Sequence, residues 1–125
     1  MTTPDYYKYD DGETHFECFD ISRYYSGDWA QVIQYVFRWQ KKDGIKDLEK
    51  ALACAKDAQA NGIIPKPITK SHILRRTIKR KLIILSKQDF SNAHKVWEGI
   101  IMRYDATDEI IAALEEMIRD AKNVG

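Results

Sequence analysis

The sequence predicts an all-α protein, a compact bundle of about five to six helices that follows an irregular, aromatic-rich N-terminal arm. Three observations lead to this prediction. Apolar residues recur at helical spacing through most of the chain after residue 16. No stretch shows the alternation of apolar and polar residues that is typical of a half-buried strand. With 125 residues, of which 44% are hydrophobic, the chain has the size and apolar content of one globular domain.

The N-terminal arm covers residues 4 to 15, where Pro4 and the run Asp10-Asp11-Gly12 interrupt any helical pattern. Most aromatic residues of the chain lie in its first 39 positions. Such clustering usually marks the densest part of a small core, and aromatic rings also stack on nucleobases. A first short helix is predicted at about residues 16–24. It would place Glu17 and Asp20 on one face, where two carboxylates can share a ligand.

Two helices joined by a Lys-Asp-Gly turn follow, and they form the centre of the predicted structure. Asp28 and Gln31 resemble a capping box at the start of the first of these helices, and Gly44 is expected to end it. Its apolar stripe contains Trp29, Val32, Ile33 and Val36, and its polar stripe contains Gln31, Gln34, Tyr35, Arg38, Lys41 and Lys42. The next helix covers about residues 45–59, with Leu48, Leu52 and Ala55 facing inward and Asp47, Lys50 and Asp57 facing elsewhere.

Residues 61–67 are the one convincing interior linker, because Pro65 and Pro67 flank a single residue and favour extended backbone. We expect a helical hairpin module at residues 1–62 and a three-helix segment at residues 63–125 that packs on it within one globular domain. The three helices are predicted at about residues 69–85, 92–104 and 108–122. Apolar stripes on the last two would permit a homo-oligomer, although the same stripes serve equally well inside one bundle.

The formal net charge of +1 conceals a strong segregation of charge along the chain. The segment from Lys66 to Lys87 contains eight Lys or Arg residues and no acid, whereas the segment from Asp105 to Asp120 contains six acids and one Arg. Different partners would therefore meet very different faces of the molecule.

Composition and motifs exclude several classes of protein. Cys18 and Cys54 lie far apart and outside any Cys/His cluster, so neither a zinc site nor a disulfide framework is indicated, and a reducing cytosolic compartment fits best. The polar N-terminus is not typical of a signal peptide, and no apolar run approaches the length of a membrane span. The P-loop, the dinucleotide fingerprint and the common metalloprotease and serine hydrolase motifs are also absent.

A phosphate pocket at one end of the two-helix hairpin is the first functional hypothesis. The candidate ligands are Arg38, Lys41, Lys42, Lys50 and the phenol of Tyr35. The planar guanidinium of Arg38 matches a phosphate edge, which makes it the best bidentate ligand among them. Carboxylates that would orient these cations or hold a divalent ion are Glu17, Asp20 and Asp47. The alternative is a solvated face on which Asp47 and Lys50 form a surface pair that contributes only a few tenths of a kcal/mol.

A basic face on the fourth helix is the second functional hypothesis. Its cations are Arg75, Arg76, Lys79, Arg80 and Lys81. Such a face could neutralise nucleic-acid phosphates, and binding would then depend steeply on salt. The alternative is that this helix pairs with the acidic sixth helix, which offers Glu115, Glu116 and Asp120, or that its charge merely keeps the protein soluble.

Four short motifs lie within residues 4 to 56. They are Tyr6-Tyr7-Lys8, then Glu17 with Asp20, then Gln34-Tyr35 with Arg38, and finally the set Lys42, Gly44, Asp47, Leu48, Lys50 and Ala51. Together they resemble a family of small bacteriophage proteins described as SaV-like or nucleotide-kinase-like. The match covers a little under half of the chain. It departs from the family at two positions, because Tyr6 stands where the family has His and Gln34 stands where the family has Lys.

The resemblance implies a viral protein of the infected bacterial cytoplasm that handles nucleotides without a P-loop, at its fullest a nucleoside monophosphate kinase that uses Mg²⁺ and ATP. In that activity Arg38, Lys42 and Lys50 would hold phosphate charge, because phosphoryl transfer depends mainly on positioning and electrostatic stabilisation. The three carboxylates would orient these cations or hold magnesium, and Tyr7 or Tyr35 would contact a base or sugar. If the two departures affect the phosphoryl chemistry, ligand binding would remain without turnover.

Two other classes of function stay open. One is a non-enzymatic phage interaction protein that binds nucleic acid or a host protein through the basic helix at residues 70–87. The other is an all-α nucleotide pyrophosphohydrolase, in which Glu17 and Asp20 would supply part of the carboxylate set around magnesium.

Overall fold

The computed structural model describes residues 3–102 and 104–123, and it confirms the predicted all-α class. The described residues are 66% helical, and they form six α-helices and a small two-stranded sheet. The elements in order are η1 (Asp5–Tyr7), β1 (Lys8–Asp10), β2 (His15–Glu17), α1 (Phe19–Ser22), α2 (Gly27–Arg38), α3 (Ile45–Ala60), α4 (His72–Lys87), η2 (Phe90–Asn92), α5 (His94–Met102) and α6 (Thr107–Asn123). None of the described helices is long and apolar enough to cross a membrane.

The N-terminal arm is more regular than predicted, because it forms a 3-10 turn and an antiparallel β-hairpin. Tyr9 lies opposite Phe16 in this hairpin, and their stacked rings, 4.9 Å apart, are both buried. The residues that predicted irregular backbone make the hairpin turn: Asp11 Oδ1 accepts the N–H of Thr14 at 2.7 Å, and Gly12 has a positive φ of 89°. Strands of three residues are too short for an alternating pattern to be recognised.

The helix predicted at residues 16–24 is also shorter than expected and covers only Phe19–Ser22. Glu17 belongs to strand β2, and its backbone N–H donates to Asp20 Oδ2 at 2.8 Å. The expected helix face that would carry both carboxylates is therefore not formed.

Helix α2 buries the predicted apolar stripe, but both of its ends differ from the prediction. Ser26 occupies the N-cap position without a side-chain capping bond, so Asp28 and Gln31 do not form a capping box. The helix ends at Arg38, and a turn leads to Gly44, whose φ of 60° places it at the N-cap of α3. The N–H of Gly44 also donates to the carbonyl of Trp39 at 2.8 Å, which closes this turn.

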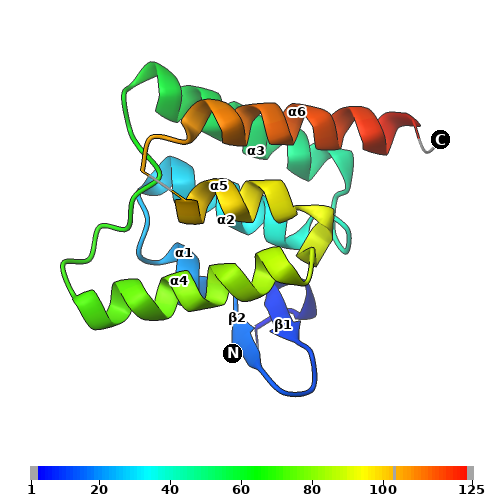
Figure 1. The fold of residues 1–125 in the computed structure, drawn as a ribbon. Coiled ribbons are helices and arrows are strands. Elements are labelled where there is room, and N and C mark those ends of the chain that lie inside the picture. Colours follow the sequence, from blue (N-terminus) through cyan, green and yellow to red (C-terminus); the bar gives the residue numbers. More distant parts are fainter. Residues whose placement is uncertain (1–2, 103, 124–125) are drawn as a thin grey trace.

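Helix α3 packs between α2 and α6, and α5 packs between α6 and α4. Figure 1 shows the resulting arrangement, with α3 and α6 side by side at one end and α4 at the other. One apolar cluster joins the two halves of the chain, and Trp29 and Trp97 are its largest fully buried side chains. Asp47 on α3 is the main exception to the predicted pattern: it was expected to face away from the interior, and it is completely buried.

Gly99 on α5 is required by the packing of α5 on α6. A Cβ atom at this position would lie 2.7 Å from Cγ1 of Ile110, a buried side chain that cannot withdraw freely. We therefore expect Gly99→Ala to lower the free energy of unfolding by about 1–3 kcal/mol through overpacking, although alanine is the better helix former. Urea denaturation measures this change. Gly27→Ala is the matched control, because its Cβ would meet no atom within 4 Å; equal destabilisation of both variants would contradict the argument.

Candidate functional site

The candidate site centres on an ion pair between the end of α2 and the start of α3. Arg38 Nε donates to Asp47 Oδ2 at 3.2 Å, and Arg38 Nη2 donates to Asp47 Oδ1 at 2.9 Å. This is the bidentate geometry in which a guanidinium edge and a carboxylate match. The two residues are nine positions apart in sequence, and the turn of residues 39–44 brings their side chains together.

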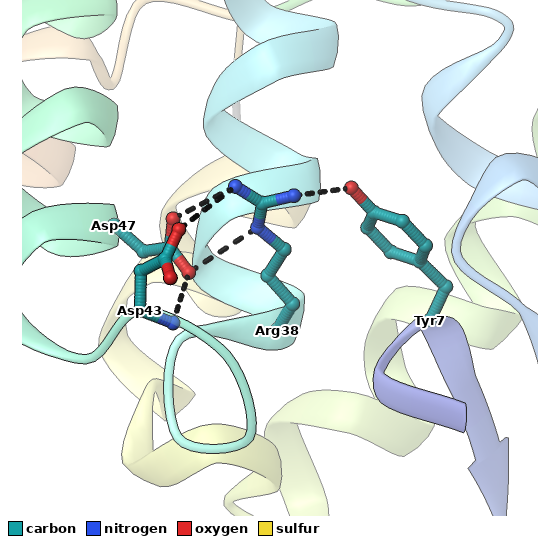
Figure 2. Close-up of polar contacts among 4 residues, drawn as sticks. All are labelled: Tyr7, Arg38, Asp43 and Asp47. Atoms are coloured by element: carbon teal, nitrogen blue, oxygen red, sulfur yellow. Dashed lines mark hydrogen bonds and ion pairs between the residues drawn. The ribbon is translucent and has the colours of Figure 1, made fainter. Parts of the chain in front are cut away.

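Arg38 and Asp47 have further partners on either side (Figure 2). Arg38 Nη1 donates to the hydroxyl oxygen of Tyr7 at 2.8 Å, which connects α2 to the N-terminal 3-10 turn. The backbone N–H of Asp43 donates to Asp47 Oδ2 at 3.1 Å, and the Asp43 carboxylate lies 3.8 Å from Arg38 Nη2. Every nitrogen of the guanidinium therefore already faces a protein oxygen.

The two charges of this network are largely removed from water, which costs free energy, and they compensate each other by pairing closely. Asp47 is fully buried, and only 14% of the Arg38 side chain is exposed. Burial by itself lowers the pKa of Arg38, but the hydrogen bonds to Asp47 and Tyr7 outweigh it and hold that pKa above its ordinary value. Burial also raises the pKa of Tyr7, partly opposed by its bond from Arg38. Arg38 thus stays charged, and Tyr7 stays a neutral phenol at physiological pH.

Three tyrosine rings and two lysines surround the Arg38 guanidinium. Its Cζ lies 5.1 Å from the ring centroid of Tyr35, 5.8 Å from that of Tyr7 and 6.0 Å from that of Tyr6. Lys50 Nζ lies 5.7 Å from the Tyr35 ring, and Lys42 Nζ lies 5.7 Å from the Tyr6 ring. Such distances are within the range of cation–π attraction. Both lysines are exposed, so their ammonium groups remain open to solvent.

The structure thus gathers most residues of the predicted phosphate pocket and leaves out three. Tyr7, Tyr35, Arg38, Lys42, Asp47 and Lys50 come together. The three left out are Lys41, Glu17 and Asp20. Lys41 lies in the turn with an exposed side chain, and Glu17 belongs to strand β2. Asp20 accepts the backbone N–H of Glu17 and lies 3.9 Å from Arg23. Sequence reasoning missed Asp43 as a member of the network; its place beside Gly44 in the predicted turn was the available signal.

The alternative assignment of Asp47 to a surface pair with Lys50 is wrong. Asp47 is buried against Arg38, whereas Lys50 extends toward Tyr35. The described residues include no group of three or more His, Cys, Asp or Glu side chains arranged to hold a metal ion. Arg38 also lines none of the five best-formed clefts among the described residues.

The basic face of α4 differs from the hairpin, because its cations have no acidic partners among the described residues. Arg76, Lys79 and Arg80 are exposed, and none of the ion pairs within residues 3–102 and 104–123 involves α4. Arg75 Nε instead donates to the backbone carbonyl of Thr69 at 2.8 Å, and Lys81 Nζ lies 6.0 Å from the ring of Phe16.

The expected pairing of α4 with the acidic α6 is therefore wrong. Glu115 lies 3.9 Å from Lys56 on α3, and Glu116 lies 3.0 Å from Lys95 on α5. The physical reason is the arrangement in Figure 1, where α5 lies between α4 and α6.

Comparisons with protein-family models, with curated proteins and with solved structures found no match for this chain. The resemblance of residues 4–56 to the phage family therefore stays a prediction.

Loss of one partner of the Arg38–Asp47 pair is expected to destabilise the fold strongly. Asp47→Asn would leave a largely buried guanidinium without its counter-charge, so we expect the free energy of unfolding to fall by about 2–4 kcal/mol. Asp43→Asn is the matched control, because the Asp43 carboxylate is 39% exposed and 3.8 Å from Arg38; its loss should cost less than about 0.5 kcal/mol. Urea denaturation measures the free energy of unfolding of both variants. Equal losses in the two variants would contradict the argument that the buried carboxylate matters more than the exposed one.

Proposed function

We propose that this protein binds a nucleotide or a related phosphate compound on the surface that Lys42, Lys50 and the tyrosines form around Arg38. The observation that carries this proposal is the placement of two solvent-open ammonium groups, each 5.7 Å from a tyrosine ring that itself lies within 6.0 Å of the paired guanidinium of Arg38. Ammonium groups attract phosphate oxygens, and tyrosine rings offer a flat face to a base. From the resemblance alone, we further propose a phage protein that acts in the cytoplasm of its bacterial host.

In this proposal Arg38 is not the bidentate phosphate ligand that its residue type suggested. Its bidentate edge is filled by Asp47, so a phosphate could reach it only by breaking a buried ion pair. Arg38 is therefore a positioning residue, which fixes Tyr7 and the hairpin turn, while Lys42 and Lys50 make the direct contacts with phosphate. Asp47 is likewise the partner of Arg38 and not a magnesium ligand.

Phosphoryl transfer would add a second nucleotide to this surface. The resemblance implies such an activity with ATP, and magnesium would then arrive with the ATP phosphates, because the described residues offer no carboxylate cluster of their own. The residues at the two positions that depart from the family, Tyr6 and Gln34, each contact another side chain. Tyr6 faces Lys42, and Gln34 Nε2 donates to the hydroxyl oxygen of Ser22 at 3.3 Å. No observation favours the pyrophosphohydrolase, because Glu17 and Asp20 do not share the predicted helix face.

The test is nucleotide binding by the wild-type protein and by two lysine variants. Titration calorimetry with ATP and with a panel of nucleoside monophosphates should show binding that Lys42→Ala/Lys50→Ala weakens about tenfold or more, because two direct phosphate contacts are lost. Lys46→Ala is the matched control, because Lys46 is an exposed lysine on the same helix as Lys50. It should leave the affinity unchanged.

Phosphorus NMR of the same mixtures with magnesium separates binding from turnover. Nucleoside diphosphates that appear with the wild type and not with the double variant would establish the kinase. If no nucleotide binds, or if the double variant binds as tightly as the wild type, the proposed function is wrong.

A further inference from the structure

The linker between α3 and α4 and the adjoining face of α4 form a second surface, here termed the linker–α4 surface. It exposes large aliphatic side chains of the linker, namely Ile63, Ile64 and Ile68, of which Ile68 is 66% exposed. The exposed cations of the same surface are Lys66, Lys70, Arg76 and Lys79. Contiguous apolar side chains bordered by charge are typical of interaction sites.

The backbone of the linker is held in place at three points. Trp29 Nε1 donates to the carbonyl of Ile63 at 2.8 Å, and the N–H of Ile68 donates to the carbonyl of Tyr24 at 2.7 Å. The third contact is the hydrogen bond that Arg75 Nε donates to the carbonyl of Thr69. These bonds fix the linker on the bundle while its isoleucines stay in solvent. The exposure of the isoleucines is therefore a property of an ordered segment.

Two clefts with volumes of about 310 and 380 Å³ adjoin on this surface. They share Pro67 and Arg75, so Arg75, whose Nε donates to the carbonyl of Thr69, borders both of them. Apolar side chains contribute to both walls, including Ile78 and Leu82 in the first cleft and Ile64 and Ile68 in the second. None of the described residues that line either cleft is acidic.

We propose that the linker–α4 surface docks an acidic, amphipathic segment of another protein. Apolar side chains of that segment enter the two clefts, and its carboxylates meet the cations around them, chiefly Lys70, Arg76 and Lys79. The cations have no acidic partner among the described residues, so an acidic ligand can pair with them without breaking an existing ion pair. This inference is independent of nucleotide binding at the hairpin.

The shape and chemistry of the surface favour a peptide over the other anionic partners. Sites for single-stranded nucleic acid stack bases on aromatic rings, whereas the exposed apolar groups here are mainly aliphatic. An anionic lipid surface is met by a continuous apolar helix face, whereas these apolar groups line separate concave clefts.

The test selects peptide partners and maps where they bind. A displayed library of short random peptides is selected against the wild-type chain, and the recovered peptides are synthesised and measured by fluorescence anisotropy. The recovered sequences should be acidic with at least two apolar residues. Lys79→Glu and Ile68→Ser should each raise their Kd about tenfold, because both residues line a cleft and both are exposed enough to be changed without loss of the fold.

Lys87→Glu is the matched control, because Lys87 is an exposed lysine of the same helix that lines neither cleft. It should change the Kd less than twofold. The proposal is overturned if no peptide is recovered, if the peptides are neutral or basic, or if Lys79→Glu and Lys87→Glu weaken them equally. It is also overturned if oligothymidylate or phosphatidylserine vesicles bind through Lys79 and Ile68 while the peptides do not, or if sedimentation shows a dimer that Ile68→Ser dissociates.

Discussion

The burial of the Asp47 carboxylate is the constraint on which the N-terminal half of the molecule depends. A carboxylate removed from water needs compensating hydrogen bonds, and Asp47 receives two from Arg38 and one from the backbone of Asp43. These bonds tie the end of α2 to the start of α3 and define the turn between them. Because Arg38 also donates to Tyr7, the same charge holds the N-terminal 3-10 turn and the β-hairpin against α2.

This constraint decides what the hairpin offers to a ligand. The charges of Arg38 and Asp47 cancel at short range, so the pair contributes rigidity and little attraction for an anion. The attractive charge comes from Lys42 and Lys50, whose ammonium groups extend beyond the pair, while Asp43 reduces it on one side. The ammonium groups of flexible lysine side chains impose less geometry on a ligand than a planar guanidinium does. This surface is therefore suited to recognising the charge of a phosphate more than its exact shape.

The sequence predicts the helices of this fold better than it predicts their neighbours. The stripe from Trp29 to Val36 repeats at helical spacing because it is buried, and periodicity reports burial directly. Asp47 was assigned to the surface because a single sequence does not show a buried partner across a turn. The hairpin strands carry too few residues to display alternation. Opposite charges on α4 and α6 suggested a pairing, but charge patterns do not specify which helices are adjacent, and α5 intervenes.

The two surfaces of the molecule differ in how their charge is compensated. On the hairpin, the central cation is neutralised inside the fold, whereas on α4 the exposed cations have no acidic partner among the described residues. The linker that precedes α4 shows the same contrast for apolar groups, since its backbone is bonded to α2 and to the α1–α2 loop while Ile64 and Ile68 remain in water. Exposing these side chains contributes no burial energy to the isolated chain. Their ordered display is therefore better explained by contact with a partner than by the stability of the fold.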